Sequence, residues 1–389
     1  MKTHKTQMPP LAVYVHWPFC RSKCPYCDFN SHVRARIDET AWAEALCREL
    51  DYFATFAGPR RVTSIFFGGG TPSLMSPTTV GRILERVGNH WQLEETVEIT
   101  LEANPTSVEA GKFRDFAAAG INRVSLGVQS LRDADLKALG REHDVAEART
   151  AIDLAQKYFR RHSFDLIYAR MGQSLSDWEQ ELQEALELAV DHLSLYQLTI
   201  EQGTAFYNAY HRGRLRLPEE EVAADMYDIT QDICAAAGLP AYEISNHARP
   251  GEESRHNLAY WRYEEYLGIG PGAHGRLSMG EKVYALSQKR KPEDWLRQVE
   301  ADGHATEFLE PLSALMMAEE MVMMGLRLRE GVSLKAVEKR IGRSISDFLD
   351  QTRLENLVDQ GLLDWRDGTL RTTRRGRPLL NALLRQILA

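Results

Sequence analysis

YVHWPFCRSKCPYC, residues 14–27, joins the end of a predicted buried strand to three cysteines, Cys20, Cys24 and Cys27. Three thiolates spaced C-x3-C-x2-C can surround one metal centre if the chain wraps in a tight loop directly after the strand. A 4Fe–4S cluster held by three cysteines leaves one iron open for a small-molecule ligand. Structural zinc needs a fourth protein ligand, which His16 or His32 could supply. Because zinc cysteines usually come in C-x2-C pairs, the spacing favours an iron–sulfur cluster over zinc.

The composition of the whole chain is that of an average globular protein. Its 389 residues are 43% hydrophobic and 26% charged, enough for two or three domains. The net charge of −8 and the lack of a basic stripe argue against a nucleic-acid partner. No apolar run approaches the roughly 18 residues of a membrane span, and residues 1–10 do not resemble a secretory signal, so we expect a cytoplasmic protein. The odd number of cysteines, five, argues against a disulfide framework. We predict that Cys47 and Cys234 are core residues.

Short apolar runs alternate with helix-length amphipathic segments over residues 11–250. Six of these runs are rich in Val, Ile, Phe and Tyr, as strands buried on both faces are. They are Leu11–Trp17, Val62–Phe67, Val97–Leu101, Arg123–Leu126, Ser163–Ile167 and Leu193–Ile200. Between them, capping signals predict helices over Thr78–Trp91, from Val108 to Ala119, over Ser176–Val190 and over Pro218–Ala237. Six strand–helix repeats predict an α/β fold, a partial (β/α)6 barrel, with a doubly wound sheet as the competing architecture.

The alternation of apolar runs and amphipathic segments ends near residue 250. We therefore predict a tail (1–10), a core domain (11–250) and a C-terminal domain (251–389). Residues 251–305 are interpreted as an irregular connecting segment. Their run GIGPGAHG does not follow a clear strand of a βαβ unit, which excludes a dinucleotide loop. The pattern over residues 306–389 predicts a smaller, mostly helical, winged-helix-like part. Its elements are helices Leu312–Leu328, Leu334–Arg340 and Ile345–Gln360, strands Leu362–Trp365 and Thr369–Thr372, and a helix ending at Leu388. The third helix has no dense basic face, so we interpret this part as a packing module.

A glycine-rich run, FFGGGTP (residues 66–72), follows the second predicted strand. Consecutive glycines let the backbone approach a ligand, and their N–H groups can bind an anion or a carboxylate. Glu102 ends the third strand, Gln129 follows the fourth and Asp165 lies in the fifth. Because the C-terminal ends of parallel barrel strands open on one rim, we expect these groups and the cysteine loop to surround one cavity. Taken singly, each residue could equally serve as a cap or a turn.

Five motifs occur in a fixed order, namely YVHWPFC with its three cysteines, GGGTPS, LEANP, GVQS and FDLIY. With them the chain, from about Leu11 to its C-terminus, resembles the radical S-adenosylmethionine (SAM) superfamily. Within it, the motifs are most similar to those of the oxygen-independent coproporphyrinogen III oxidases and their relatives, the HemW heme chaperones. The resemblance implies that Cys20, Cys24 and Cys27 ligate three irons of a 4Fe–4S cluster. The fourth iron is then left for the amino and carboxylate groups of SAM.

The same resemblance implies which residues hold SAM. Tyr14 would border the cluster and the SAM pocket. The methionine end of SAM would be lined by the backbone of Gly69, Gly70 and Thr71. The remaining SAM-binding positions of the family fall on Glu102, Gln129, Arg141 and Asp165. Without the motifs, Arg141 would be interpreted as a surface arginine on a helix.

One departure and one match distinguish the relatives. The oxidases resemble C-x3-C-x2-C-x-C, and the position of their fourth cysteine is Phe29 here; they also have a longer segment ahead of the cluster. The match is HNLAYW (residues 256–261), similar to an H-N-x-x-Y segment linked to heme binding in the chaperones. It implies His256 as an axial heme ligand, with Tyr260 on the same face at i+4. The alternative is that His256 packs and hydrogen-bonds inside the protein. A second departure is ARM at residues 169–171, where the family often has GLP, which should change the turn below the cavity.

Three functions agree with these patterns. The first, which we favour, is a heme chaperone that carries the cluster and SAM, delivers heme to apo-proteins such as membrane respiratory enzymes, and is compatible with a homodimer. The second is an oxygen-independent coproporphyrinogen III dehydrogenase, which performs oxidative decarboxylation with a 5′-deoxyadenosyl radical; Phe29 counts against it. The third is a zinc-stabilised scaffold with a winged-helix contact to nucleic acid.

Overall fold

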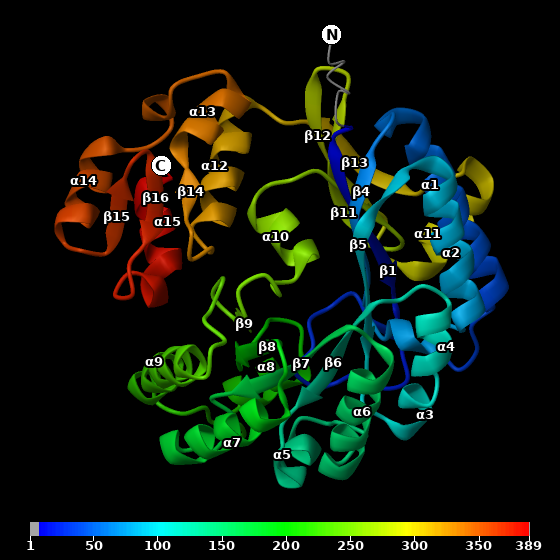
Figure 1. Ribbon diagram of the computed structural model, residues 1–389, viewed down its shortest axis with the longest axis horizontal. Coiled ribbons are helices and arrows are strands. Elements are labelled where there is room, and N and C mark those ends of the chain that lie inside the picture. Colours follow the sequence, from blue (N-terminus) through cyan, green and yellow to red (C-terminus); the bar gives the residue numbers. More distant parts are fainter. Residues whose placement is uncertain (1–7, 389) are drawn as a thin grey trace.

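The computed structural model describes residues 8–388 and centres on one curved, eleven-stranded sheet (Figure 1). Its strands are β1 (Pro10–Trp17), β4 (Arg61–Gly69), β5 (Gln92–Ala103), β6 (Arg123–Gln129), β7 (Arg161–Tyr168), β8 (His192–Gln197), β9 (Asn246–Ala248), β10 (Tyr266–Ile269), β11 (His274–Met279), β12 (Lys282–Gln288) and β13 (Thr306–Pro311). From edge to edge they run β13-β12-β11-β10-β1-β4-β5-β6-β7-β8-β9. Residues 1–7 of the predicted tail lie outside the described residues, and Pro10 already belongs to β1.

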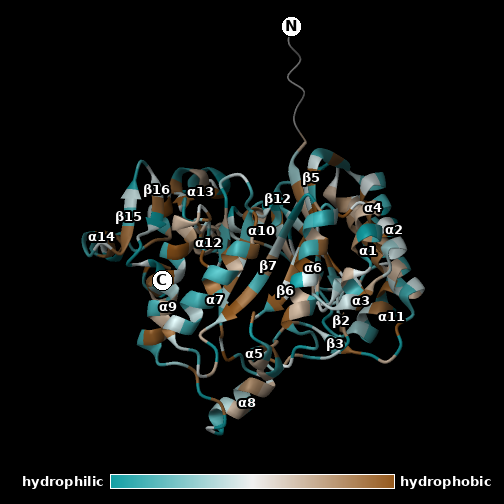
Figure 2. Ribbon diagram, turned by 60° about the horizontal axis from the view of Figure 1, so that its bottom comes forward, coloured by the Kyte–Doolittle hydropathy of each residue, from teal (hydrophilic) through white to brown (hydrophobic). Residues whose placement is uncertain are grey.

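The parallel part of the sheet confirms the partial (β/α)6 barrel. Strands β1, β4, β5, β6, β7 and β8 are neighbours in chain order, and each pairs in parallel with the next. A doubly wound sheet would reverse its strand order at a switch point, which this succession excludes. The strands are buried on both faces, as in β1, where six of eight residues are buried. Figure 2 shows β6 and β7 in the brown of hydrophobic residues.

Helices follow the barrel strands along the chain, and the longer ones cover the outer side of the sheet (Figure 1). They are α1 (Glu39–Ala57), α2 (Pro77–His90), α3 (Ser107–Ala110), α4 (Phe113–Ala118), α5 (Asp133–Ala138), α6 (Val145–Tyr158), α7 (Leu175–Leu188), α8 (Ala205–His211) and α9 (Glu220–Ala236). The expected start of α2 is present, because Ser76 accepts a hydrogen bond from Thr79 N and Pro77 is the first helical residue. The helix expected from Val108 to Ala119 is split into α3 and α4, because the chain turns at Gly111. Cys47 and Cys234 are core residues as predicted.

The segment 251–305 is not the irregular connection that its composition suggested. It contains α10 (Arg255–Trp261), α11 (Pro292–Asp302) and three strands that extend the barrel sheet. Strand β10 pairs in parallel with β1, and β11, β12 and β13 follow in antiparallel order. The Trp295 ring of α11 stacks on Trp42 of α1 at a centroid distance of 5.2 Å, so the segment shares the barrel core. The GIGPGAHG run makes the turn between β10 and β11, as expected of a run that is not a dinucleotide loop.

The C-terminal part has a hydrophobic core of its own, built mainly from side chains between Ala318 and Ile387. Its elements are α12 (Ala314–Gly325), β14 (Val332–Ser333), α13 (Leu334–Ile341), α14 (Gln351–Asp359), β15 (Leu363–Arg366), β16 (Thr369–Thr372) and α15 (Leu380–Ile387). The strands form a small sheet in the order β14-β16-β15. The helix expected over Ile345–Gln360 begins only at Gln351, because Asp350 is its N-cap and accepts a hydrogen bond from Arg353 N through its side chain. A 3-10 turn, η2 (Ile345–Asp347), precedes it.

Figure 1 shows this C-terminal part facing the open side of the curved sheet, with α10 between them. Two further 3-10 turns are η1 (Pro72–Leu74) and η3 (Arg377–Leu379), and a two-stranded pair is made by β2 (Phe19–Cys20) and β3 (His32–Val33). Over residues 8–388, no helix combines the length and the apolar character that crossing a membrane requires. The C-terminal ends of the barrel strands open into a cavity that the cysteine loop also lines. Helix α10 lies elsewhere, against β5, where His256 N donates to Glu98 Oε1 at 3.1 Å.

Candidate functional site

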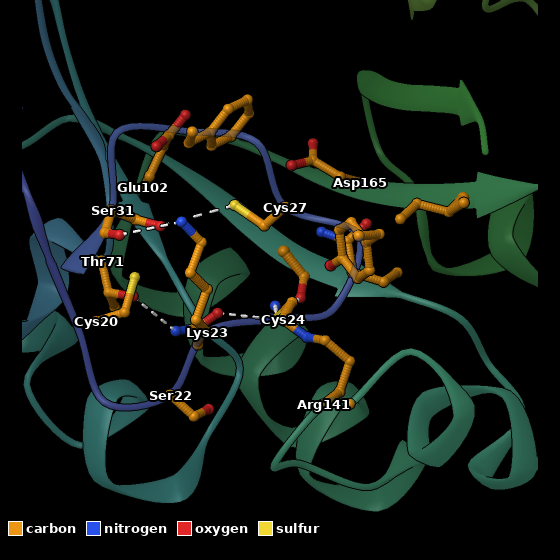
Figure 3. A pocket seen from close by; sticks show the side chains of 18 of the residues that line it. Cys20, Ser22, Lys23, Cys24, Cys27, Ser31, Thr71, Glu102, Arg141 and Asp165 are labelled. Carbon is orange, nitrogen blue, oxygen red and sulfur yellow. Dashed lines mark hydrogen bonds between the residues drawn. The ribbon is translucent and has the colours of Figure 1, made fainter. Parts of the chain in front are cut away.

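The three cysteines lie on one loop that closes between β2 and β3. Cys20 ends β2, which pairs in parallel with β3, and Cys27 N donates to Cys24 O at 3.1 Å inside the loop. All three side chains line one cavity of about 560 Å³ (Figure 3). Each sulfur has a polar neighbour in the protein. Thr71 Oγ1 lies 3.4 Å from Cys20 Sγ, Arg141 Nη1 lies 3.4 Å from Cys24 Sγ, and Ser31 Oγ lies 3.8 Å from Cys27 Sγ.

These surroundings fit an iron–sulfur cluster better than a single zinc ion. Hydroxyl and guanidinium donors at thiolate sulfurs are the groups that tune cysteine-ligated clusters. The imidazole of His16 uses both nitrogens elsewhere, with Tyr14 Oη at 3.0 Å and Asn30 O at 2.9 Å, and His32 Nε2 pairs with Asn30 Oδ1. Neither histidine is therefore placed as a fourth zinc ligand. Within residues 8–388, no three Cys, His, Asp or Glu side chains converge as ligands of a single ion.

The glycine run packs against the cysteine loop. Gly70 N donates to Trp17 O at 2.7 Å and Thr71 N donates to Phe19 O at 2.8 Å. A Cβ on Gly70 would lie 2.6 Å from Phe19 O, so this position excludes any side chain. Gly69 N donates to Glu102 Oε2 at 3.1 Å. The expectation that the glycine N–H groups bind an anion or a carboxylate is met within the protein by Gly69, whose partner is the Glu102 carboxylate. Gly70 N and Thr71 N instead donate to backbone carbonyls, so these three N–H groups all have protein acceptors.

The polar rim residues surround the same cavity. Glu102 of β5, Gln129 of β6, Arg141 of the turn after α5 and Asp165 of β7 all line it. Figure 3 shows Glu102, Arg141 and Asp165 around the cysteine loop. Burial, and then repulsion from Asp165, raises the pKa of Glu102 to about 8. Burial also raises the pKa of Asp165 to about 6. Two carboxyl groups held in one cavity favour a cationic or hydroxyl-bearing ligand, and SAM carries an ammonium, a sulfonium and ribose hydroxyls.

Gln129 holds a backbone conformation that glycine prefers. Its φ is 74°, and the pairing of β6 with β7 shifts register between Leu126 and Gln129. Strained backbone of this kind costs on the order of 1–3 kcal/mol and gathers at functional sites. At this irregularity of β6 the side chain of Gln129 lines the cavity.

Arg141 is not a surface arginine. Its Nη2 donates to Asn104 Oδ1 at 2.5 Å and to Gly127 O at 2.7 Å, while Nη1 faces Cys24 Sγ. Asn104 in turn donates through Nδ2 to Thr71 Oγ1 at 3.2 Å, and Thr71 donates to Cys20. A chain of hydrogen bonds therefore joins Cys24 to Cys20 through three polar side chains. Asn104 was not singled out from the sequence, although it stands in the quoted LEANP motif.

The turn after β7 accommodates the departure from the family pattern. Ala169 has a φ of 55°, the region that the glycine usual at this position occupies without strain. Arg170 is buried, at 2% exposure, and its guanidinium bonds to Ile167 O, Asp135 Oδ2 and Glu181 Oε2. Ile167 lines the cavity. A buried ion-pair cluster thus holds the cavity floor in place of the usual turn sequence.

A second cavity, of about 700 Å³, lies beside the first. Phe29, Gly69 and Glu102 line both cavities, so they form a common wall. Tyr14, expected to border the cluster, lines this second cavity, together with residues of α10, β10, β11, β12 and α12. The Tyr14 ring reaches this cavity because it packs over Gly68. A Cβ on Gly68 would lie 2.9 Å from the Tyr14 ring.

His256 is a packed and fully hydrogen-bonded residue, the alternative that the sequence left open. It is 1% exposed, Nδ1 pairs with Ser64 Oγ at 2.9 Å, and Nε2 pairs with Tyr260 Oη at 2.9 Å. Its ring stacks on Phe66 at a centroid distance of 5.0 Å. Burial, and then Arg123, lowers the pKa of His256 to about 3. Tyr260 is on the same helical face, as expected, and it lines the second cavity.

Comparison with known proteins adds the following findings. The family profile of the radical SAM superfamily matches residues 14–185, and that of the HemN C-terminal domain matches residues 312–379. The heme chaperone HemW of Escherichia coli is 36% identical, over 98% of this chain and 99% of its own length. A bovine protein, radical S-adenosyl methionine domain-containing protein 1, mitochondrial, is 40% identical over 97% of this chain and 87% of its own length. The structure of coproporphyrinogen III oxidase (HemN) from Escherichia coli superposes with a TM-score of 0.82 at 23% identity, covering 97% of this chain and 90% of the other. At that identity the last similarity concerns the fold alone.

Proposed function

Because the chain belongs to the HemW heme-chaperone family of radical SAM proteins, we propose that it binds heme and transfers it to heme-accepting apo-proteins. Membership of the radical SAM superfamily implies a 4Fe–4S cluster and SAM. The observation that carries the choice of a chaperone is Phe29, which is 60% exposed in the wall between the two cavities. Related oxidases resemble one another in having a cysteine at this position. An apolar ring at this wall suits a carrier of a flat, apolar cargo.

In this proposal Cys20, Cys24 and Cys27 would hold three irons of the cluster and would leave its fourth iron available to SAM. When bound, the cluster supplies single electrons. Arg141 offsets negative charge at the cysteine loop, since its guanidinium lies against Cys24 Sγ. Asn104 fixes the guanidinium in that position through its Oδ1.

SAM itself would lie between the glycine run and the rim. The backbone of Gly69, Gly70 and Thr71 offers SAM its carbonyl oxygens and the glycine methylenes, since its N–H groups are occupied. Glu102 and Asp165 supply carboxyl groups for the cationic and hydroxyl parts of the ligand, and burial raises the pKa of both groups. Gln129 supplies an amide from the strained turn of β6. This assignment leaves the second cavity free for another ligand.

The acceptors of the heme in this proposal are apo-proteins such as respiratory enzymes, and its setting is the cytoplasm. The five cysteines are all free, three of them near the protein surface, which suits a reducing compartment.

Anaerobic turnover separates the chaperone from the dehydrogenase. The reconstituted protein receives SAM, a reductant and coproporphyrinogen III, and both protoporphyrinogen and 5′-deoxyadenosine are assayed. We expect stoichiometric heme binding in a parallel titration and no protoporphyrinogen. Protoporphyrinogen formation would overturn the proposal and establish the dehydrogenase. A Cys24→Ser variant is the matched control, because it should lose iron and every cluster-dependent product.

A further inference from the structure

The second cavity is bounded by the edge of the barrel sheet and by helices from two parts of the chain. Its walls come from β1 and β10–β12 on one side and from α10 and α12 on the other. Figure 1 shows α10 between the sheet and the C-terminal part, to which α12 belongs. At about 700 Å³ it is within the range of cavities that enclose a cofactor-sized molecule.

One wall of this cavity is aromatic. Tyr260 and Trp261 belong to α10, Tyr263 follows that helix, and Tyr266 begins β10. The rings of Tyr260 and Tyr266 meet edge to face at a centroid distance of 4.6 Å. Large aromatic surfaces held rigidly in a cavity favour a flat, apolar ligand.

A completely buried side chain in the wall has polar atoms without partners. Gln288 is 0% exposed, it lines the cavity, and neither its Nε2 nor its Oε1 has a hydrogen-bond partner. It stands at the register shift between β12 and β13, which begins after Ser287. Such irregularities in a strand re-aim side chains beside functional sites. Because buried polar groups almost always have partners, an unpaired amide here points to a polar group of a ligand.

The cavity also presents a histidine that the protein leaves accessible. His274, at the start of β11, is exposed and lines the cavity. His16 and His256, by contrast, are buried and have both ring nitrogens paired. Partial burial, and then Arg276 and Arg290, lowers the pKa of His274, so its ring is neutral and has a lone pair available to a metal ion.

The charged groups at the cavity differ in their pairing. Arg276 forms a two-pronged ion pair with Glu320 of α12, and Tyr263 Oη donates to the same carboxylate at 2.5 Å. Arg290 is exposed, and no acidic partner of its side chain occurs between residues 8 and 388. The backbone carbonyl of Arg290 accepts a hydrogen bond from Asn30 Nδ2 at 2.9 Å, which fixes Arg290 against the cysteine loop. An unpaired guanidinium at the rim suits a carboxylate of the ligand.

We propose that the second cavity is the heme site, with His274 as the axial ligand, the aromatic wall against the porphyrin, and Arg290 on a propionate. This rests on the proposed function, since heme is the cargo that it assigns. It differs from the interpretation of the sequence, which placed the iron on His256. The cargo then lies beside the cluster cavity, separated from it by Phe29, Gly69 and Glu102.

The test is a heme titration of the full-length, cluster-loaded protein, followed by the Soret absorption and by electron paramagnetic resonance of the ferric heme. The variants are His274→Ala and His256→Ala, and His211→Ala is the matched control because His211 is an exposed histidine outside both cavities. We expect His274→Ala to shift the Soret band, to change the ferric spin state and to raise the dissociation constant by about tenfold or more. Added imidazole should restore the wild-type spectrum of that variant. His211→Ala should behave as the wild type.

Each outcome has a definite meaning. A wild-type spectrum and affinity in His274→Ala would overturn the heme site while the proposed function stood, as would loss of ligation in His256→Ala with His274→Ala unaffected. Absence of heme binding by the wild-type protein would overturn both. The propionate contact is tested separately with Arg290→Gln. The wild type should bind heme more tightly than its dimethyl ester, and this variant should not; an unchanged preference would refute the contact.

Discussion

Replacing Glu181 by alanine should remove the ion-pair cluster that holds the floor of the first cavity. Glu181 is 1% exposed and accepts hydrogen bonds from Ser130 Oγ and Leu131 N, each at 2.7 Å. It also pairs with Arg170 Nη2 at 2.5 Å. Alanine would leave one buried cation with fewer partners and would remove the acceptor of three buried donors, Ser130 Oγ, Leu131 N and Gln173 Nε2. Each such group costs about 1–3 kcal/mol, and breaking a buried pair costs about 3–5 kcal/mol in unfolding free energy. We therefore expect a loss of about 3–5 kcal/mol.

The assay is urea unfolding followed by tryptophan fluorescence, with the shift in midpoint converted through the common slope. Glu184→Ala is the matched control on the same helix, because its partner Arg132 lies at 2.7 Å but the Glu184 side chain is 29% exposed. It should lose no more than about 1 kcal/mol. The double variant Arg170→Leu/Glu181→Leu should be more stable than Glu181→Ala, since no buried charge is left unpaired. Equal losses for Glu181→Ala and Glu184→Ala would refute the reasoning.

Three other substitutions test the site and its backbone. Glu102→Gln should flatten the pH dependence of the stability of the ligand-free protein between about pH 4.5 and about pH 8. Burial, and then Asp165, raises the pKa of Glu102 to about 8, so the native state holds a proton that the unfolded state releases. The stability of the wild type therefore falls as the pH rises through this window. Melting temperatures across the window check this, and equal slopes in both proteins would contradict it. Gly70→Ala should lower the iron content after reconstitution, because its Cβ would lie 2.6 Å from Phe19 O; Gly81→Ala, whose nearest neighbour is 3.9 Å away, should keep full iron and gain up to about 1 kcal/mol. Equal iron in the two variants would mean that the glycine is not needed. Ala169→Gly should stabilise the protein by up to about 1 kcal/mol, since relief of the left-handed φ of 55° outweighs the extra freedom of glycine in the unfolded chain; a lower melting temperature would show that the alanine is unstrained.

Local patterns were sufficient for the barrel and for the set of residues around the first cavity. Strands such as β1 are buried on both faces, so each appears in the sequence as a short apolar run, and parallel order follows from the helices between them. The ends of those strands share one rim, which is why Glu102, Gln129 and Asp165 could be grouped with the cysteine loop from sequence order alone. The cysteine spacing itself favoured an iron–sulfur cluster over zinc.

Other features depended on contacts between distant parts of the chain. Strand β10 is short, and its parallel partner β1 lies at the opposite end of the barrel sequence, so no local period marks it as part of the sheet. The family resemblance assigned Arg141 to SAM, although without the motifs it would be interpreted as a surface arginine on a helix. Only the fold shows that its guanidinium contacts Cys24 and Asn104. The glycine N–H groups looked free, and only the packing of the loop shows that their acceptors are in the protein.

The sequence by itself determined the barrel and the cysteine loop, because hydrophobic periodicity and short-range spacing are local properties of the chain. The family followed from the resemblance of its motifs. The tertiary structure decided which histidine is accessible: His256 is enclosed between Ser64 and Tyr260, whereas His274 opens into a cavity whose walls come from both ends of the chain. Burial and the pairing of polar atoms depend on neighbours that are far apart in sequence. For that reason the motif in the sequence pointed to His256, whereas the fold leaves the imidazole of His274 accessible.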